Sequence, residues 1–279
     1  MAAISNKIDF TVIFSVKKAN PNGDPLDGNR PRVDYDGFGE VSDVCIKRKI
    51  RNRLQDMNER IFVQSDERKD DGYKSLRERA EGCAELKAIK KDNDKFAEVA
   101  CKEWIDVRSF GQVFAFKGLD VSVGVRGPVT VQTAVSAAPI DSSTMNITKS
   151  VNSETKDKKA SDTMGAKHRV EYGVYRFNGS INVQLAEKTG FSDDDADKIK
   201  KALETLFEND CSSARPEGSM EILKVYWWKH NCKSGQYSSA KVHRTVEIEV
   251  KNDGRHPEDY EIKYTPLDGL EAEIYDGIQ

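Results

Sequence analysis

The run KIDFTVIFSVKKANPNGDP, residues 7–25, decides how the fold begins. Residues 7–19 are rich in β-branched and aromatic side chains, which favour a strand. The strand is predicted to end at NPNGDP, residues 20–25, because proline and glycine interrupt regular structure. Prolines and glycines continue to residue 40, so a long surface loop follows. Loops of this length in compact domains are often functional.

A helix is predicted over residues 43–58, directly after this loop. Ser42 is a favourable N-cap residue, and apolar residues recur at helical spacing. The apolar stripe consists of Ile46, Ile50, Leu54 and Met57. Residues 44–54 also hold five cations and no acid: Lys47, Arg48, Lys49, Arg51 and Arg53.

The rest of the chain predicts an α+β fold. Residues 66–105 mix charges with Ala, Leu and Ile, as a helical insertion with solvated faces would. The predicted core elements that follow are strands at 106–116, 119–135, 170–187 and 220–230 and a helix at 192–210 capped by Ser192. Two further edge strands are predicted at 242–250 and 260–267. Without its insertions the order is βαββαβ, the ferredoxin-like arrangement.

Composition narrows the class of protein. The 279 residues suffice for one or two domains, with 37 % hydrophobic and 33 % charged residues. No apolar run is long enough for a membrane helix, and the first residues do not resemble a secretion signal. The five cysteines are widely spaced and form no C-x-x-C pair, which argues against a disulfide framework or a zinc site. We therefore expect a cytoplasmic protein.

The net charge of −3 hides local segregation of charge. The cation run at 44–54 is typical either of a solvated helix face or of a clamp for a polyanion. A solvated face usually interleaves both signs, so the missing acid partners favour the clamp. The preceding loop adds Arg30 and Arg32. These observations leave nucleic-acid binding and a structural role about equally supported.

Residues 141–169 form a second polar stretch, with cations and scattered apolar side chains. Its composition favours an exposed loop. The alternative is a protruding arm whose apolar tip wedges between bases while lysines follow the phosphates.

Catalytic and metal-binding motifs are weak. Asp34–Gly37 has part of a calcium-loop pattern, but Arg32 would occupy its first ligand position, so a calcium site is excluded. The histidines lack metal-ligand spacing, and no P-loop or H-E-x-x-H motif occurs. Asp24, Asp27, Asp34 and Asp36 could serve metal-assisted phosphodiester cleavage, but they are better explained as turn formers. The sequence predicts no cofactor, no metal and no enzymatic activity.

Five motifs, in order and spacing, resemble one known family. They are NPNGDP (20–25), EVSDVCIKRKIRNRL (40–54), DVRSFGQVF (106–114), VRGPV (125–129) and TMGAKHRVEYGVYRFNG (163–179). The chain resembles the crRNA-binding backbone subunit of type I CRISPR–Cas Cascade complexes, most closely that of subtype I-C. This family belongs to the repeat-associated mysterious protein (RAMP) superfamily. The resemblance extends over about residues 8–230.

The resemblance implies a single RRM-like, that is ferredoxin-like, domain over residues 1–279 with a protruding β-hairpin thumb. Its expected parts are a palm at about 8–60 and 106–250, a helical insertion at 61–105, a thumb at 139–169 and a C-terminal tail at 251–279. The implied function is an antiviral one: copies polymerise head-to-tail along crRNA, bind its phosphates without sequence preference and present bases to target DNA. Implied partners are crRNA, the target DNA strand, further copies of the chain, the large subunit and the subunit that caps the crRNA 5′ end, without a membrane.

The resemblance also implies residue roles. Loop residues lie beside the RNA, helix cations contact phosphates, and Phe110 and Gly111 lie on a palm strand. The thumb folds over the crRNA of a neighbouring subunit, with Met145 or Met164 displacing a base. The full predicted RNA-binding set is Asn20, Asn22, Gly23, Arg30, Arg32, Lys47, Arg48, Arg51, Phe110, Gly111, Arg126, Met145, Lys149, Met164, Lys167, His168 and Arg169.

Two alternatives remain. Type III relatives cut target RNA with a loop aspartate, and Asp24, Asp27 or Asp34 lies in a comparable loop. The surrounding NPNGDP matches the non-cleaving type I family, so a metal-dependent target-RNA endonuclease is the second hypothesis. A scaffold that polymerises without nucleic acid is the third, and it leaves the cation run unexplained.

Overall fold

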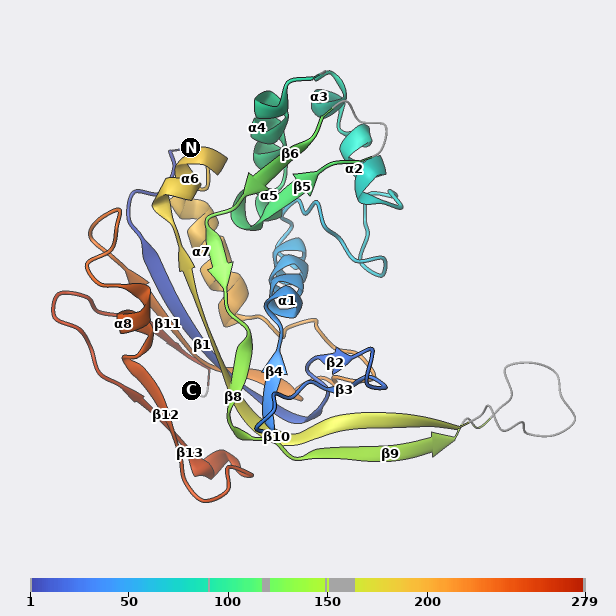
Figure 1. The fold of residues 1–279 in the computed structure, drawn as a ribbon, viewed down its shortest axis with the longest axis vertical. Helices are drawn as coiled ribbons and strands as arrows, with labels where there is room; N and C mark the ends of the chain where they lie inside the picture. The colour runs from blue at the N-terminus through green and yellow to red at the C-terminus, as the bar shows by residue number, and fades with distance from the viewer. Residues whose placement is uncertain (1, 90, 117–120, 149, 151–163, 278–279) are drawn as a thin grey trace, which may run out of the picture.

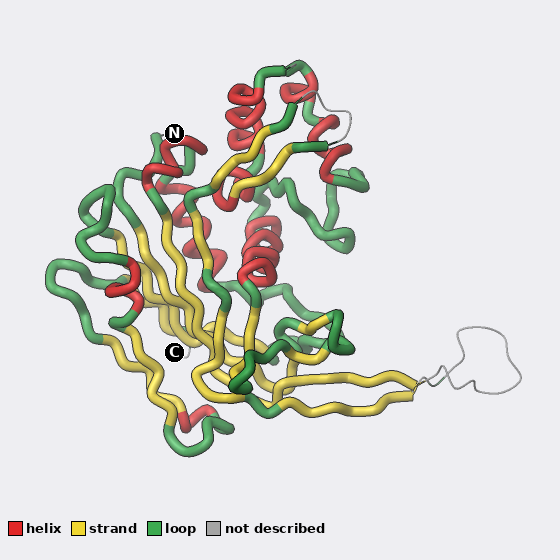
Figure 2. The backbone as a smooth tube through the Cα atoms, viewed as in Figure 1, coloured by secondary structure: helices red, strands yellow, loops and turns green. Residues whose placement is uncertain are grey.

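The computed structural model describes residues 2–89, 91–116, 121–148, 150 and 164–277. The chain is a mixed α+β fold built on one large antiparallel sheet with the strand order β14-β11-β1-β10-β8-β4, and β7 and β9 also pair with β10 (Figures 1 and 2). The strands are β1 (Ile8–Ala19), β4 (Phe38–Val41), β7 (Val129–Val131), β8 (Ala134–Pro139), β9 (Ser142–Thr148), β10 (Met164–Ile181), β11 (Met220–Lys229) and β14 (Glu273–Asp276).

The central strand β1 is buried on both of its faces. Its even-numbered residues, such as Phe10 and Phe14, belong to the largest hydrophobic cluster, whereas Ile13 belongs to a second cluster on the opposite face. A strand covered on both sides has a continuous apolar sequence, which is why residues 7–19 were predictable from sequence.

Helices cover the first face of the sheet. The α1 helix (Asp43–Asp56) starts at its N-cap Ser42, as predicted, and buries the predicted apolar stripe in the largest cluster. The α7 helix (Asp193–Glu204) starts at Ser192 with a capping box, in agreement with the predicted helix at 192–210. Between β10 and α7 lies the short helix α6 (Val183–Thr189).

The C-terminal part of the chain covers the second face. It contains α8 (Ser239–His243), β12 (Val246–Val250), β13 (Tyr260–Tyr264) and a 3₁₀ turn at Pro257–Asp259. Val242 and Val246 pack there against Ile13 and Trp228. The two further strands predicted at 242–250 and 260–267 are present as β12 and β13, and they pair with each other in a separate two-stranded sheet.

The insertion forms a body of its own between α1 and β7. It contains α2 (Leu76–Gly82), α3 (Ala84–Lys87), α4 (Asn93–Glu103), α5 (Ile105–Phe110), β5 (Gly111–Phe114) and β6 (Val123–Arg126). Phe62, Phe96, Trp104 and Phe114 lie at the centre of its hydrophobic cluster. The helical character predicted for this region is confirmed.

Two predicted strands are wrong in part. Residues 106–116 hold all of α5 except its first residue, followed by the short strand β5, which pairs with β6 away from the large sheet. The long strand predicted at 119–135 is divided between β6, β7 and the start of β8. The buried Asp106 carboxylate holds this helix against the linker after α1 by accepting backbone hydrogen bonds from Phe62 and Val63 at 2.7 and 3.0 Å.

A two-stranded ribbon projects from the sheet at the predicted thumb (Figure 1). It is made of β9 and the first residues of β10, paired from Ser142–Val170 to Thr148–Met164. The strand predicted at 170–187 ends at Ile181, because Asn182 caps α6 with a hydrogen bond from the Leu185 amide. No helix within the described ranges is both long and apolar enough to cross a membrane.

Candidate nucleic-acid interface

The loop after β1 is fixed by its own asparagines. Asn20 is buried, and its side-chain amide donates to the Asn29 carbonyl at 2.7 Å. The Asn22 side-chain oxygen accepts from the amide and the hydroxyl of Ser42 at 2.9 and 3.0 Å. A Cβ on Gly23 would lie 2.1 Å from the Asn29 side chain. Asn20, Asn22 and Gly23 therefore shape this loop and join it to the start of α1.

The exposed part of the loop is the hairpin of β2 (Gly23–Asp24) and β3 (Arg30–Pro31). Arg30 is 56 % exposed and lies 3.8 Å from Asp27, whereas Arg32 is 36 % exposed and lies 3.3 Å from Asp24. Exposed ion pairs of this kind are weak, so either guanidinium can exchange its partner for a phosphate.

The loop aspartates have local structural partners. Asp24 accepts a hydrogen bond from the Leu26 amide, and Asp34 accepts from the amides of Asp36 and Phe38. This is the turn-forming role predicted for them. Among the residues that the structure describes, no group of His, Cys, Asp and Glu is arranged to hold a metal ion.

The cations of α1 do have acidic partners, so the predicted acid-free face is wrong. Lys47 pairs with Asp43, four residues earlier and one residue outside the cation run, at 3.0 Å. Lys49 is buried against Asp210, and burial lowers the pKa of Lys49 despite that carboxylate. Arg53 donates to Thr205 and Glu208. Three of these partners, Thr205, Glu208 and Asp210, lie in the segment directly after α7 (Asp193–Glu204).

The two remaining cations of α1 face the insertion. Arg48 donates to the Val63 carbonyl, and burial lowers the pKa of its guanidinium. Arg51 is 3.0 Å from the fully buried Asp106, and its guanidinium carbon lies 5.0 Å from the centre of the Phe110 ring. Both side chains thus hold the insertion against α1.

Phe110 and Gly111 do not lie on a strand of the large sheet, which corrects the predicted palm strand. Phe110 is the last residue of α5, and Gly111 starts β5 opposite Arg126. Gly111 has φ +82°, and a Cβ there would lie 2.3 Å from the Val125 carbonyl oxygen. Gly127 is restricted in the same way by the Ser109 carbonyl oxygen. Arg126 remains exposed beside this junction.

The thumb has two different faces. In the β9–β10 register, Met145 is opposite Lys167, and Ile147 is opposite Gly165, so these four residues share one face. Met164 is opposite Thr148 and lies on the other face. The two predicted wedge residues therefore point to opposite sides of the ribbon. Both are exposed, Met145 by 37 % and Met164 by 67 %.

The base of the thumb is polar. His168 shares a hydrogen bond of 2.9 Å with the Thr144 hydroxyl, and Arg169 pairs with Glu171 at 3.2 Å. Lys149 lies outside the described residues, so its predicted role stays a prediction.

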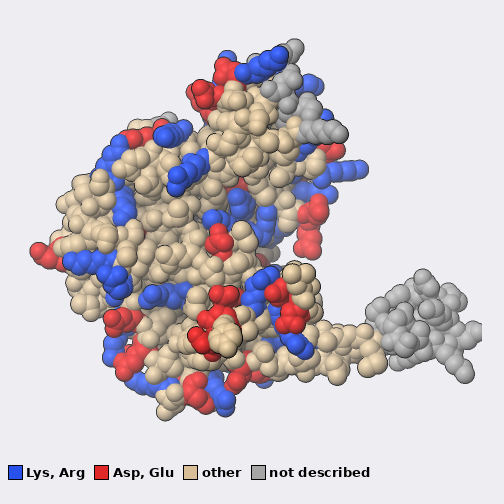
Figure 3. All heavy atoms as spheres, viewed as in Figure 1, with Lys and Arg blue, Asp and Glu red and all other residues tan. Residues whose placement is uncertain are grey.

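The predicted residues therefore fall into two groups at the ends of α1. One group comprises the β2–β3 hairpin and the thumb, and β3 lies against β10. The other is the junction of Arg51, Phe110, Gly111 and Arg126. Along α1, Arg51 lies eight residues after Asp43, a rise of about 12 Å. Figure 3 shows Lys and Arg side chains along the notch between the insertion and the hairpin, with acids among them.

The face of the sheet that binds bases in many RRM proteins is closed here. Residues from α8, β12 and the following loop bury Trp228 and Tyr226 on this face. Trp227, on the opposite face, stacks on Phe10 with ring centres 5.5 Å apart. Bases cannot stack on strands covered in this way. The predicted RNA-binding residues lie away from this face, at the notch, the hairpin and the thumb.

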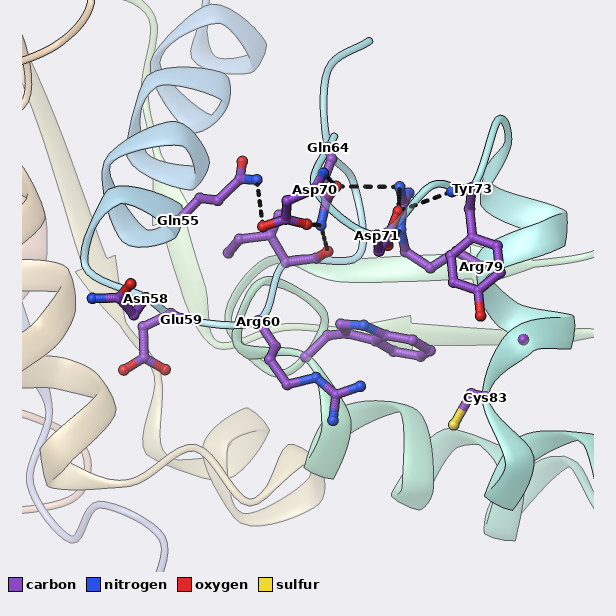
Figure 4. A pocket seen from close by; sticks show the side chains of 13 residues that line it. Gln55, Asn58, Glu59, Arg60, Gln64, Asp70, Asp71, Tyr73, Arg79 and Cys83 are labelled. Carbon is purple, nitrogen blue, oxygen red and sulfur yellow. Dashed lines mark hydrogen bonds and ion pairs between the residues drawn. The ribbon is translucent and has the colours of Figure 1, made fainter. Parts of the chain in front are cut away.

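A polar pocket of about 290 Å³, not found by sequence reasoning, lies between the end of α1 and the insertion (Figure 4). Its side chains are bonded to one another: Gln55 and Gln64 both donate to Asp70, and Arg79 pairs with Asp71 at 3.0 Å. Arg79 is only 5 % exposed and also donates to the Phe62 carbonyl. These contacts fix the insertion relative to α1.

Comparisons with known proteins identify the family. The sequence model of the family described as CRISPR-associated protein Cas7 matches residues 6–265. A relative from Haloferax volcanii, described by the same words, is 24 % identical over 237 residues, covering 79 % of this chain and 69 % of its own length. The predicted family is thereby confirmed, while the closer resemblance to subtype I-C stays a prediction.

One solved structure agrees in fold. A chain of a structure described as a CRISPR RNA-guided surveillance complex, pre-nicking, superposes with a TM-score of 0.52 at 17 % identity, covering 86 % of this chain and 84 % of that chain. A chain of a second CRISPR RNA-guided surveillance complex has a TM-score of 0.48 at 17 % identity, covering 80 % of this chain and 68 % of that chain. This protein belongs to the Cas7 family of CRISPR-associated proteins.

Proposed function

We propose that the chain is a crRNA-binding backbone subunit of a CRISPR surveillance complex. Membership of the Cas7 family is the observation that carries this proposal. Copies of the chain bind head-to-tail along the crRNA, hold its phosphates and leave stretches of bases to pair with the target DNA strand. Contacts of this heterologous kind do not close into a ring, so the RNA and capping subunits set the length.

The domain organisation that we propose is a ferredoxin-like palm with inserted fingers and thumb. Counting β1, β8, β10 and β11 as strands one to four, their order across the sheet is four-one-three-two. That order, with α1 after the first strand and α7 after the third, supports the ferredoxin-like assignment. Residues 230–272 then form a cover over the second face of the palm, and β14 returns to the edge of the sheet.

Within this domain, the exposed cations of the hairpin and the thumb are the proposed RNA contacts. Arg30, Arg32 and Lys167 have exposed or half-exposed side chains. Arg48 and Arg51 already bond to the fold, so we assign them the task of positioning the insertion at the RNA. Phosphate contacts without base contacts give binding without sequence preference.

The proposed role is not enzymatic. The loop aspartates that a target-RNA nuclease would use each have another partner: Asp24 pairs with Arg32, Asp27 with Arg30, and Asp34 holds a turn. We place the complex in the cytoplasm, with the large subunit and the 5′-end-capping subunit as further partners. The thiols of all five cysteines are free, in keeping with that compartment.

The salt dependence of crRNA binding tests the proposal. We expect Arg30→Ala with Arg32→Ala to weaken binding, because fewer phosphates are then neutralised by the protein. The logarithmic salt slope should become shallower by about 0.7 for each phosphate that no longer has a cationic partner. The measurement is fluorescence anisotropy of labelled crRNA over a series of salt concentrations.

The matched control removes two exposed cations elsewhere. Lys188 and Arg244 are exposed and have no ion pair among the described residues, so Lys188→Ala with Arg244→Ala should keep the wild-type slope. Equal slopes for both double variants and the wild type would exclude the hairpin as the RNA contact.

A further inference from the structure

A second pocket lies at the base of the thumb, on the face of the large sheet opposite α1. It encloses about 340 Å³ and is lined by residues from three parts of the chain: the end of β1, the start of the thumb, and the turn before β13. This volume is within the range of about 300–1,000 Å³ that is usual for sites of small ligands. The lining residues used below are Lys17, Lys18, Asp141, Glu171, Tyr172 and Arg255.

Two consecutive lysines line this pocket, which is unusual for a strand. Neighbouring strand residues normally point to opposite faces. Lys18 departs from extended geometry with φ +52°, a left-handed conformation that is uncommon for lysine. The irregular backbone thus brings Lys17 and Lys18 to one cavity. Within the described ranges neither lysine forms an ion pair, and both are exposed.

The acids of the pocket are already paired. Asp141 lies 2.8 Å from Arg255, and Glu171 lies 3.2 Å from Arg169. Ser143 also donates to Glu171, and this hydrogen bond is the main cause of the lowered pKa of that carboxyl group. Lys18 also lowers the pKa of Glu171 through its charge. Among the charged residues that line the pocket, Lys17, Lys18 and Arg255 exceed Asp141 and Glu171 by one cation, so the lining favours an anion.

An aromatic wall stands beside these cations. Tyr172 is the cross-strand partner of Lys17, so both side chains project from the same face of the sheet. The Tyr172 ring is half-buried and is supported by Tyr260, with ring centres 5.9 Å apart. A fixed aromatic ring next to cations is the chemistry that binds a base together with its phosphate.

We propose that this thumb-base pocket binds a phosphorylated nucleotide, with the phosphate at Lys17 and Lys18 and the base against Tyr172. The pocket includes none of the predicted crRNA-binding residues, and it lies next to the thumb on the face of the sheet opposite α1. The same nucleotide chemistry can come from a free nucleotide or from one unit of a single strand.

The test compares two probes on the full chain: AMP and a short oligothymidylate. Saturation-transfer NMR measures AMP binding, and anisotropy measures binding of the labelled oligothymidylate. We expect Lys17→Ala with Lys18→Ala to weaken AMP binding about tenfold for each lysine removed. We expect Tyr172→Leu to weaken it at least about fivefold and Tyr172→Phe to retain it.

The control is Lys188→Ala, which removes an exposed lysine outside the pocket. Binding of both probes, abolished in the double variant, assigns the pocket to nucleotides in general. Binding of oligothymidylate alone, reduced by the double variant and not by the control, assigns it to a single strand. The proposal is overturned if neither probe binds wild-type protein, or if the double variant and the control bind equally.

The proposal for the pocket and the proposal for the crRNA interface can be tested separately. Arg30→Ala with Arg32→Ala should leave AMP binding unchanged, since neither arginine lines the pocket. Loss of crRNA binding in that variant, with AMP binding kept, separates the two sites.

Discussion

Arg51 shows how a cation that looks available in sequence is used by the fold. Its partner Asp106 is fully buried, accepts two backbone amide hydrogen bonds and lies 55 residues away in sequence. The same carboxylate therefore holds residues 62–63, in the segment after α1, against α5. A helical-wheel analysis of residues 44–54 contains no information about such a distant partner.

Replacement of Arg51 by alanine should destabilise the protein strongly. It leaves the buried Asp106 carboxylate without its cation, and breaking one side of a buried pair costs about 3–5 kcal/mol. Urea unfolding of Arg51→Ala measures this. Arg30→Ala, at an exposed position, should change the free energy of unfolding by less than about 0.5 kcal/mol. A similar stability for both variants would contradict the structural role of Arg51.

Because His243 is buried, we expect the free energy of unfolding to fall in mild acid. Burial lowers the pKa of His243, although Asp9, 3.9 Å away, opposes this effect. Below about pH 6.5 the unfolded chain binds a proton that the folded chain takes up less readily, so the free energy of unfolding decreases as pH falls. The slope from this group is at most about 1.4 kcal/mol per pH unit.

Urea unfolding at several pH values between about 7 and 5 measures this dependence. The variant His243→Asn should show a flatter profile. An equally steep decline in the variant would assign the effect to other groups.

At the scale of elements, the helices and strands that could be predicted are those marked by an N-cap residue or by a continuous apolar run. Ser42 and Ser192 cap α1 and α7 where expected, and β1 was recognised from its apolar run. The α6 helix was missed although Asn182 is an N-cap residue and Gly190 is a left-handed C-cap. Its seven residues follow β10 directly, so the strand predicted from the pattern of residues 170–181 was extended into the helix.

Gly111 decides where α5 ends and β5 begins, and its replacement tests that junction. Its φ of 82° and ψ of 167° are accessible essentially to glycine alone, and an added Cβ would meet the Val125 carbonyl oxygen. We expect Gly111→Ala to lower the free energy of unfolding by roughly 1–3 kcal/mol.

Gly190→Ala is the matched control for this variant. Gly190 also has a positive φ, of 74°, but a Cβ there would have nothing within 4 Å. Its replacement should cost about 1 kcal/mol or less. A smaller loss of stability for Gly111→Ala than for Gly190→Ala would contradict the close approach of the Val125 carbonyl.

The two faces of the thumb lead to a prediction about the displaced base. Met145 shares its face with Lys167, so the apolar and the cationic contact occur together there. In crRNA with 2-aminopurine at the displaced position, Met145→Ala should lower the fluorescence of the unstacked base, and Met164→Ala should leave it unchanged. The opposite result would assign the wedge to the other face. Both side chains are exposed, so neither variant should change stability by more than about 0.5 kcal/mol.

At the scale of the whole molecule, long-range packing determines what the sequence could not show. The family and its α+β class were predictable, because five motifs occur in the expected order. The acid partners of α1, the closed second face of the sheet and the pocket at the base of the thumb were not predictable. Each depends on residues far apart in the chain, such as Lys17 with Arg255 in one pocket.

The closed second face fits the proposed backbone role. With that face covered by α8 and β12, the RNA contacts that we propose lie at α1, the hairpin and the thumb. Bases held only through phosphates remain available for pairing.

The most direct test of the crRNA-backbone role is to sequence the RNA that copurifies with the protein when it is expressed with its CRISPR array and partner subunits. The proposed function predicts one discrete RNA species that consists of a spacer with repeat-derived ends. Copurification of folded protein with random cellular RNA, or with none, in the presence of those partners would contradict it.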